Sequence, residues 1–552
     1  MEGQEVSKEG KAPWYEKGIS WVRGNAPFSV LFSSLACYYL WRLFAMPPWY
    51  DELYTYEMFI DRGVIYSMIH WPLPNNHVFF SALSAVVNKL GNPWLGLRGV
   101  SFAASLGSLI LLYRILKKEA EPGWAVLGTG LFAGMYHVTQ QAVQGRGYAL
   151  SGFFLLGAVN LLYEICVPEG EALSWKGRIG HYLGFAACLT GGLYTIPSNL
   201  YWVVPICLAG GAFLLICRDY RRLLSLIAAS AGAAAVTFGL YTVIWLAIGS
   251  NFLVKEEGSV YYGMGHVQMI LSSPAAAFLR GMRAMLSDPN IQSVERGQFL
   301  SGIGSYLMQV LDQVYHGGAG VFAVLILAAL AVMLIRGIRA FRQKERSCFF
   351  LILYCSGLTI MVPVFLFIQC VFPYLRVFTY MGSVFAMMFT LAGYWLCLAV
   401  GRGGFSLFSA ALPKGKWKGR AGGILPTAAV FCFVLCSCIR PSYHMGYDSR
   451  DNHIYAALQQ LDETKVDTVL VGDVYARLNL YFHLEKCRGK SLVMTNEKPD
   501  YVLMDKIQTG PEGNGLIWPY ERNTDDFPWE WIEENMEVVF EDDAYIAYQI
   551  RR

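Results

Sequence analysis

Long runs of apolar residues dominate this chain and constrain its fold more than any other feature. Of its 552 residues 55% are hydrophobic and only 15% are Asp, Glu, Lys or Arg, whereas a soluble domain carries about 25% charged residues. A run of roughly 18 apolar residues is long enough to cross a bilayer as a helix. A helix is stable in lipid because its backbone N–H and C=O groups are hydrogen-bonded to one another. The sequence therefore predicts a polytopic α-helical membrane protein with about eleven spans, at 27–46, 97–116, 123–142, 148–167, 179–197, 199–217, 223–249, 319–335, 348–371, 377–400 and 422–439.

The placement of Lys and Arg predicts how these spans are oriented. Cytoplasmic loops of membrane proteins are enriched in both residues. If the N-terminus is inside, every inside segment is basic, while the outer loops are longer and carry far fewer cations. The inside cations are Lys8, Lys11, Lys17, Arg23, Arg114, Lys117, Lys118, Lys176, Arg178, Arg218, Arg221, Arg222, Arg336, Arg339, Arg342, Lys344, Arg346, Arg402, Lys414, Lys416, Lys418 and Arg420. We expect a cytoplasmic N-terminus and an extracytoplasmic C-terminus.

This orientation divides the chain into three parts. Residues 1–26 form a cytoplasmic N-terminal segment with no evident cleavable signal peptide, and 27–439 form the membrane domain. Two large outer loops, 47–96 and 250–318, interrupt that domain. The formal net charge of +3 is too small to indicate a nucleic-acid partner.

The tail, residues 440–552, differs sharply from the rest in composition. It carries 21 Asp and Glu against 12 Lys and Arg. Short β-type runs at 467–472, 491–495, 501–504 and 545–548 accompany a predicted helix at 452–461. We expect a small extracytoplasmic α/β domain and infer no activity for it.

An acidic pair, Asp51-Glu52, follows the first span immediately. Pro47 and Pro48 end that span, since proline lacks the N–H donor and blocks the preceding turn. The pair then opens a predicted helix whose apolar residues, among them Leu53 and Phe59, would lie on the membrane surface. Both carboxylates would thus lie at headgroup level, beside the mouth of the bundle. The alternative is local: Asp51 caps this helix and Glu52 favours its positive end.

Four further polar residues lie on the predicted outer side. His77 follows a Pro-Asn-Asn turn, where it is either a substrate contact or a structural donor. Arg98, Arg146 and Arg376 stand at the outer ends of spans or in a short outer turn. Arginine at bilayer depth is costly unless it pairs with an anion, and phosphate suits the guanidinium fork. Snorkelling to lipid headgroups is the alternative for each.

Taken together, these features resemble the GT-C superfamily of polyprenyl-phosphate-dependent glycosyltransferases. The resemblance is to the family 39-like branch, which contains protein O-mannosyltransferases and lipid A aminoarabinose transferases. It covers about residues 40–250 by motif and 250–440 by topology. The motifs that carry it are Asp51-Glu52, Pro74-Asn-Asn-His77 with Arg98, Arg146-Gly-Tyr-Ala149 and Arg376. Where the family often shows a His-Pro-Pro-type sequence, this chain has Pro74-Asn-Asn-His77.

The resemblance implies a membrane glycosyltransferase with an extracytoplasmic active site. Its donor would be a hexose or pentose on polyprenyl phosphate, and its acceptor a glycan, lipid or protein. Such transfer needs a general base near the attacking hydroxyl and cations near the departing phosphate. We expect Asp51 to be the base and Glu52 to support it or contact the acceptor. Arg146 and Arg376 would bind the donor phosphate, and the single displacement would invert the sugar carbon.

Three further residues are expected to position substrates: His77, Tyr148 and Arg98. No cofactor is required by this chemistry. Two adjacent carboxylates do not make a metal site by themselves, so none is assigned, although they leave room for a divalent cation. The expected partners are the lipid bilayer, the polyprenyl-phosphate sugar and the acceptor.

Two other functions share parts of this pattern. A multi-span secondary transporter would show inverted repeats and ionisable residues near mid-membrane. The sequence shows no repeat, and its acidic groups gather at one face. A ligase or polymerase of lipid-linked oligosaccharides would share both the topology and the outward-facing site.

Overall fold

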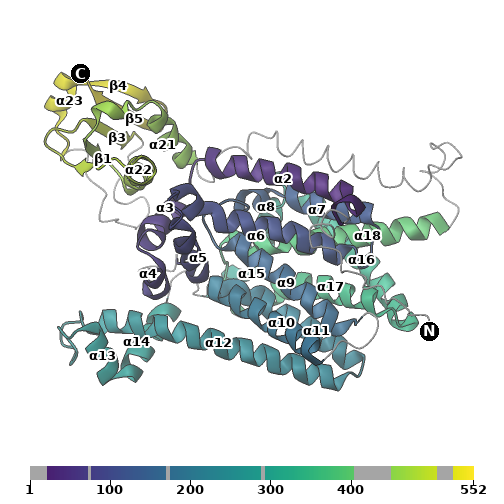
Figure 1. The fold of residues 1–552 in the computed structure, drawn as a ribbon. Helices are drawn as coiled ribbons and strands as arrows, with labels where there is room; N and C mark the ends of the chain where they lie inside the picture. Colours follow the sequence, from purple (N-terminus) through teal and green to yellow (C-terminus); the bar gives the residue numbers. More distant parts are fainter. Residues whose placement is uncertain are drawn as a thin grey trace, which may run out of the picture.

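The computed structural model describes residues 21–71, 76–168, 175–287, 293–402, 449–506 and 526–551. These ranges form a helical bundle followed by a small domain with a β-sheet (Figure 1). The first part of the bundle comprises α2 (Ala26–Ala45), α3 (Tyr50–Thr55), the π-helix η1 (Tyr56–Ile60), α4 (Val64–Ile69), α5 (Val78–Asn88), α6 (Pro93–Leu116), α7 (Pro122–Gly134), α8 (Tyr136–Gln141), α9 (Tyr148–Cys166) and α10 (Trp175–Thr195). The second part comprises η2 (Pro197–Asn199), α11 (Leu200–Ile216), α12 (Tyr220–Leu253), α13 (His266–Ser272), α14 (Pro274–Leu286), α15 (Arg296–Asp312), α16 (Ala319–Gln343), α17 (Arg346–Gln369), the 3₁₀ helix η4 (Leu375–Tyr380) and α18 (Met381–Arg402).

Eight helical segments of the described chain are long and apolar enough to cross a membrane. They are Ala26–Ala45, Pro93–Leu116, Tyr148–Cys166, Pro197–Ile216, Tyr220–Leu253, Ala319–Gln343, Arg346–Gln369 and Leu375–Ala399. The chain is therefore a multi-pass membrane protein, as its apolar runs predict. The expected count of about eleven spans is not confirmed. The run 179–197 lies in α10, which is not among the eight, and the run 422–439 lies outside the described residues.

The predicted span 123–142 is wrong as a continuous helix, because the chain breaks at Met135. α7 ends at Gly134, and Met135 has an extended backbone with φ −71° and ψ 135°. The next two amides donate to a distant segment, Tyr136 to the carbonyl of Val314 at 2.9 Å and His137 to that of Gln313 at 3.0 Å. These bonds satisfy donors that a continuing helix would have paired internally.

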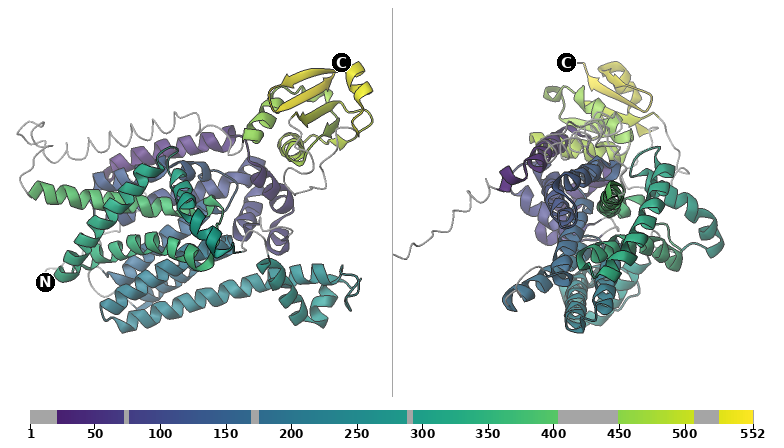
Figure 2. Two further views of the ribbon diagram at one scale, coloured as in Figure 1. Left: turned by 180° about the vertical axis from the view of Figure 1, so that it is seen from behind. Right: turned by 90° about the vertical axis from the view of Figure 1, so that its right-hand side faces the viewer.

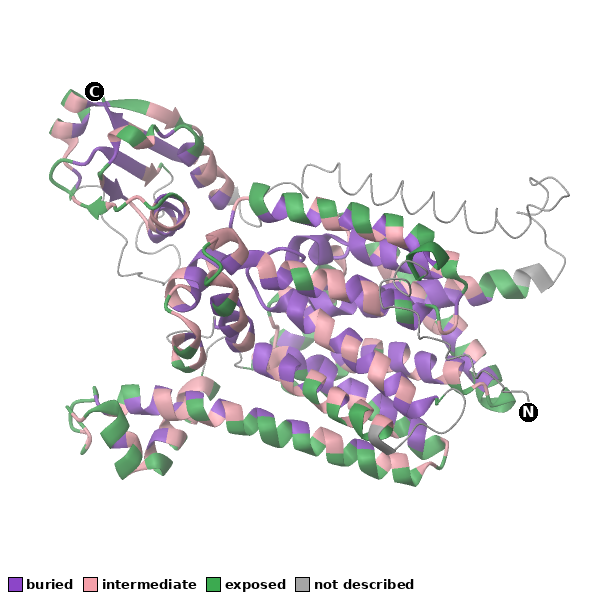
Figure 3. Ribbon diagram, viewed as in Figure 1, coloured by how far each residue is buried: buried purple, intermediate pink, exposed green. Residues whose placement is uncertain are grey.

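The surface of α12 agrees with a lipid environment. This helix has 34 residues, and Figure 3 shows it mostly exposed or half-buried along its length. Its exposed side chains include Val236, Phe238 and Val243. Large apolar side chains on the outside of a long helix are stable where lipid replaces water as the surrounding solvent.

Helices from the three regions predicted to lie outside the membrane gather at one end of the bundle. Figure 1 shows α3–α5, the pair α13 and α14, and the C-terminal domain at that end, on the left of the view, and Figure 2 shows the same grouping from behind. Asp51 and Glu52, which lie in α3, and His77, which directly precedes α5, therefore belong to the end of the bundle that also carries the C-terminal domain.

The C-terminal domain is built on a five-stranded sheet of order β2-β1-β3-β5-β4. β1 pairs parallel with β2 and β3, while β5 pairs antiparallel with β3 and β4. Its elements are α21 (Ser449–Gln459), η5 (Glu463–Lys465), β1 (Thr468–Val471), α22 (Val474–Leu480), the π-helix η6 (Tyr481–Lys486), β2 (Val493–Met494), β3 (Tyr501–Asp505), α23 (Trp529–Asn535), β4 (Met536–Glu541) and β5 (Tyr545–Ile550). The four predicted strand runs and the predicted helix are present, whereas β4, α22 and α23 were not predicted.

The apolar residues that follow Asp51 do not lie on the membrane surface, contrary to the prediction. Leu53, Phe59 and Ile60 are buried. They pack in one cluster with Leu478 and Phe482 of the C-terminal domain. That domain covers the face of α3 and η1 that amphipathicity alone would have assigned to lipid.

Candidate active site

The helix that carries Asp51 and Glu52 begins where two prolines stop the first span. Met46 and Trp49 have extended backbones, with ψ of 134° and 151°, and α3 starts at the next residue, Tyr50. The N-cap is Trp49, whose amide donates to Oε2 of Glu52 at 2.8 Å. The alternative that Asp51 caps this helix is therefore wrong, because Trp49 is the N-cap and its amide donates to Glu52. The carboxylate of Asp51 has other contacts.

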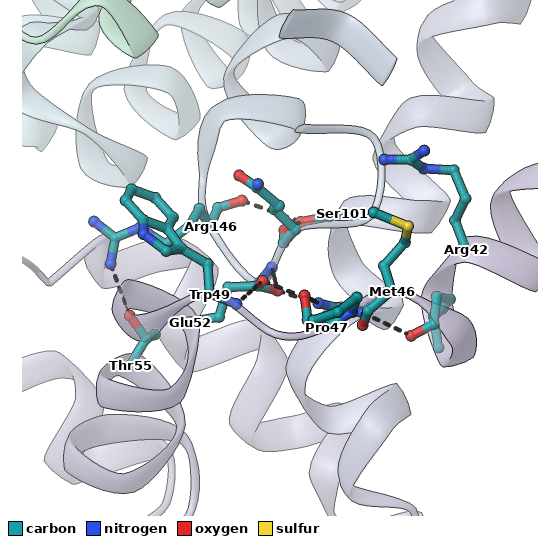
Figure 4. A network of polar contacts seen from close by, with 12 residues as sticks. Arg42, Met46, Pro47, Trp49, Glu52, Thr55, Ser101 and Arg146 are labelled. Atoms are coloured by element: carbon teal, nitrogen blue, oxygen red, sulfur yellow. Dashed lines mark hydrogen bonds and ion pairs between the residues drawn. The ribbon is translucent and has the colours of Figure 1, made fainter. Parts of the chain in front are cut away.

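Glu52 forms a buried ion pair with Arg98. Arg98 Nε donates to Oε1 of Glu52 at 2.9 Å, and Nη2 donates to Oε2 at 3.0 Å; each side chain is 1% exposed. The amide of Gly145 donates to Oε1 at 2.5 Å. Both carboxylate oxygens of Glu52 are thus occupied by protein donors (Figure 4).

Arg98 uses its remaining donors on the end of α2. Nη1 donates to the carbonyls of Leu43 and Met46 at 3.0 and 2.9 Å, and Nη2 donates to that of Pro47 at 3.2 Å. A guanidinium has five N–H groups, and these contacts with Glu52 and α2 use all of them. Snorkelling is therefore wrong for Arg98, which ties α2, α3 and α6 together.

Asp51 lies between two guanidinium groups. Its Oδ2 is 3.1 Å from Nη2 of Arg376 and 3.9 Å from Nη2 of Arg146. The side chain of Asp51 is 13% exposed and that of Arg376 is 16% exposed, whereas that of Arg146 is only 2% exposed. Asp51 and Arg376 thus form the accessible part of this cluster, and Arg146 lies behind them.

Arg146 is held by the helix that carries Asp51. Nη1 donates to the hydroxyl of Thr55 at 2.7 Å and to the carbonyl of Asp51 at 3.3 Å. Thr55 in turn donates to the same carbonyl at 2.7 Å. Figure 4 shows the contact between Arg146 and Thr55. The backbone carbonyl of Arg146 accepts from Ser101 at 3.0 Å, which fixes the turn to α6. Snorkelling is wrong for Arg146 as well.

His77 joins this cluster from the start of α5. The amide of Gly147 donates to its Nδ1 at 2.8 Å, and Nη2 of Arg146 is 3.2 Å from its Nε2. A neutral imidazole offers one lone-pair nitrogen, so we assign the shorter contact as the hydrogen bond and the proton to Nε2. Burial, with the charges of Arg146 and Arg376, holds the pKa of His77 well below its ordinary value of 6.5. The ring is therefore neutral at physiological pH.

Aromatic rings complete the surroundings of Arg376. Its Nε donates to the hydroxyl of Tyr148 at 2.9 Å. Its guanidinium lies over the rings of Trp49 and Tyr374, 4.8 and 4.4 Å from their centroids. The ring of Tyr148 also packs edge-on against His77, with centroids 5.0 Å apart. Arg376 is thus oriented by the rings of Trp49 and Tyr374 and by the hydroxyl of Tyr148.

The structure brings all seven predicted site residues together, from segments far apart in the chain. Sequence reasoning missed Thr55, Trp49 and the role of the two glycines around Arg146. Thr55 stands four residues after Asp51, the spacing that places two side chains on one helix face, so it could have been found. A Cβ on Gly147 would lie 2.6 Å from Thr195, a closeness that no local pattern signals.

One group with the ligand types of a metal site occurs in the described chain, and it lies in the C-terminal domain. His453, Asp542 and Asp543 offer one ligand atom each, all within 4.8 Å of one another. His453 Nδ1 contacts Oδ2 of Asp542 at 2.7 Å, while the side chain of Asp543 is 90% exposed. This group is separate from Asp51 and Glu52, to which no metal is assigned.

The fold of the described residues is similar to that of two solved structures of ArnT from Cupriavidus metallidurans. The structure of ArnT from Cupriavidus metallidurans bound to undecaprenyl phosphate matches 94% of this chain and 97% of that chain, with a TM-score of 0.53 and 13% identity. ArnT in the apo state matches 96% of this chain and 98% of that chain, with a TM-score of 0.52 and 12% identity.

A second protein whose solved structure is similar to this chain is the oligosaccharyltransferase of Archaeoglobus fulgidus in the apo form. It matches 87% of this chain and 69% of that chain, with a TM-score of 0.46 and 13% identity. No protein-family model and no curated protein matches this sequence.

Proposed function

We propose that this protein transfers a sugar from a polyprenyl-phosphate donor to an acceptor on the extracytoplasmic side of the membrane. The observation that carries the proposal is the carboxylate of Asp51, which lies between Arg376 and Arg146 at one end of a GT-C-like bundle. The positive-inside pattern supports the outward orientation of that end. The undecaprenyl phosphate bound to ArnT supports a lipid phosphate as part of the donor.

In this reaction an acceptor hydroxyl attacks the anomeric carbon of the sugar. Asp51 takes the hydroxyl proton while the new C–O bond forms. The bond between the anomeric carbon and the phosphate oxygen breaks, and polyprenyl phosphate leaves with both bonding electrons. A single displacement of this kind inverts the configuration of the sugar carbon.

Arg376 and Arg146 have different electrostatic roles in this proposal. Arg376 is the more exposed and already pairs with an anion, so we assign it the main contact with the departing phosphate. Arg146 is buried against Thr55 and His77, so its larger role is to hold Asp51 in place and to add positive charge behind it.

The neighbouring polar residues act by holding this arrangement. Tyr148 orients Arg376 through its hydroxyl, and Nδ1 of His77 accepts a hydrogen bond from the amide of Gly147, the residue after Arg146. Glu52 and Arg98 are positioning residues in this proposal, since burial and full hydrogen bonding give neither a way to reach the acceptor.

A transfer assay in proteoliposomes tests the proposal. Radiolabelled hexose or pentose on undecaprenyl phosphate is supplied with a membrane glycan, lipid or protein fraction. We expect label in the acceptor and release of free undecaprenyl phosphate. Asp51→Asn should lower this rate at least 100-fold, since general bases contribute about 10²–10⁴-fold. Asp467→Asn, at an aspartate that is 83% exposed in the C-terminal domain, is the matched control. Wild-type transfer by Asp51→Asn would refute the assignment.

The same preparation separates the alternatives. Time-dependent accumulation of free solute inside sealed vesicles, without transfer, would support a secondary transporter. Transfer from a diphosphate-linked oligosaccharide, but not from the monophosphate sugar, would support an oligosaccharide ligase or polymerase.

A further inference from the structure

The helix that carries Asp51 is too short to be stable without tertiary contacts. α3 has six residues, and isolated helices shorter than about 12 residues are marginal in water. One side of it is held by the bundle, through Glu52 and Arg98. The other side contacts the C-terminal domain, for which the sequence indicates no activity.

The first contact of that domain is at the start of α3. Asp451, on α21, is 1% exposed, and its Oδ2 accepts the amide hydrogen of Tyr50 at 3.2 Å. The first amides of a helix have no partner within it, and a carboxylate there also meets the positive end of the helix dipole. Asp451 thus fixes the residue directly before Asp51.

The second contact is an ion pair just beyond α3. Arg477 on α22 meets Glu57 on η1 with two bonds, Nη1 to Oε1 at 2.9 Å and Nη2 to Oε2 at 2.5 Å. The side chains are only 16% and 15% exposed. Two parallel bonds between a guanidinium and a carboxylate fix direction as well as distance.

A third contact closes the far end of the same segment. The hydroxyl of Tyr481 donates to Oδ2 of Asp61 at 2.7 Å, and Nζ of Lys486 lies 2.8 Å from the same oxygen. Between these polar contacts, the rings of Tyr56 and Phe482 pack edge-on with centroids 5.0 Å apart. Tyr56 lies in η1, and Tyr481, Phe482 and Lys486 lie in η6; these are the two π-helical segments described in the chain, and π-turns occur frequently at functional sites.

From these contacts we infer that α21, α22 and η6 of the C-terminal domain position the helix that carries the catalytic carboxylate, with Arg477 and Asp451 as positioning residues for Asp51. The inference rests on the proposed transferase function. The domain contacts the segment from Tyr50 to Asp61 at three points. These contacts set the position of the Asp51 carboxylate relative to Arg146 and Arg376. A displacement of about 1 Å at a reacting group can cost 10²-fold in rate.

Charge reversal at the central ion pair tests the inference. Arg477→Glu and Glu57→Arg should each lower kcat at least ten-fold, while KM for the undecaprenyl-phosphate sugar changes less than three-fold. The double variant, which restores an opposite pair, should recover kcat to within about three-fold of the original protein. Lys506→Glu, at an exposed ion pair with Glu541 elsewhere in the domain, is the matched control and should leave kcat unchanged.

Folding is followed separately by gel filtration and by the unfolding temperature in detergent. If Arg477→Glu fails to fold, Asp451→Ala provides the same kinetic test, with the same expected fall in kcat. An unchanged kcat in a folded Arg477→Glu or Asp451→Ala protein would overturn the inference, and so would a loss that appears only in KM for the donor.

An assay that needs no activity distinguishes this failure from failure of the proposed function. Amide hydrogen exchange over Tyr50–Ile60 should become faster in Arg477→Glu and stay unchanged in Lys506→Glu. If the wild-type protein transfers no sugar but this difference appears, the function is wrong and the docking role stands. If transfer occurs and the exchange rates do not differ, the docking role is wrong.

Discussion

Glu52 and Asp51 are adjacent carboxylates for which the structure predicts different losses of stability when each is replaced by its amide. Glu52→Gln removes one charge of a pair whose side chains are each 1% exposed. The amide also places an N–H₂ group against one of the donors that now surround the carboxylate, which come from Arg98, Trp49 and Gly145. The substitution therefore leaves a buried guanidinium without its counter-charge.

The magnitude follows from that geometry. Breaking a buried ion pair by removing one partner costs about 3–5 kcal/mol, because the other charge is left uncompensated. We expect Glu52→Gln to lower the free energy of unfolding by about that amount, together with activity. Asp51→Asn alters a carboxylate that is 13% exposed and lies 3.9 Å from the guanidinium of Arg146, so it should lower activity while it reduces the unfolding free energy by less than Glu52→Gln does.

The assay is denaturant unfolding in mixed micelles, followed by intrinsic fluorescence, with transfer activity measured on the same samples. Glu164→Gln is the control, since Glu164 pairs with Lys118 at 3.0 Å where both side chains are about a quarter exposed. An exposed pair of this kind contributes about 0–1 kcal/mol. If Glu52→Gln unfolds like Glu164→Gln, the reasoning that Glu52 is a structural anchor is refuted.

Three other predictions concern the surroundings of Asp51. Because the pKa of His77 is held well below 6.5, the folded protein binds fewer protons there than the unfolded chain, so the contribution of His77 to the free energy of unfolding should fall as pH drops below 6.5, by at most about 1.4 kcal/mol per pH unit; His77→Gln should reduce the slope of pH-dependent unfolding by up to that amount. Arg376→Lys should lower kcat/KM for the donor at least ten-fold in the transfer assay, since an ammonium lacks the planar fork, and near-normal values would contradict the phosphate role. Gly147→Ala should destabilise the protein by about 1–3 kcal/mol through a close contact with its neighbours, whereas Gly152→Ala, with open space around the new Cβ, should not differ from wild type in the same unfolding experiment.

Much of the fold follows from local sequence properties. Apolar runs of sufficient length form spanning helices wherever their surroundings are lipid, so most predicted spans coincide with helices of the structure. The break at Met135 was not predictable in this way, because it depends on the carbonyls of Gln313 and Val314 from a segment distant in the chain. Hydropathy reports on a residue and its near neighbours, whereas these hydrogen bonds depend on the packing of separate helices.

The C-terminal domain illustrates the same limit. Alternating apolar residues and turn signals predicted its strands, since strand periodicity is local. The amphipathic pattern of α3 and η1 was read as a membrane face, because a helix that packs on a protein domain and one that lies on lipid show the same pattern. Only the position of Phe482 and its neighbours decides between them.

The sequence by itself determined that this protein crosses the membrane repeatedly and carries an acidic pair beyond its first span, because length, apolarity and proline act locally. It also supplied the arginines, the histidine and the tyrosine of the candidate site. The tertiary structure decided which of the two carboxylates is a buried anchor and which lies in the accessible part of the candidate site. Glu52 meets Arg98, 46 residues away, and becomes a buried anchor. Asp51, the neighbour on the accessible side, lies between Arg146 and Arg376. Adjacent residues of a helix point in different directions, so their partners depend on which distant segments the fold brings to each side.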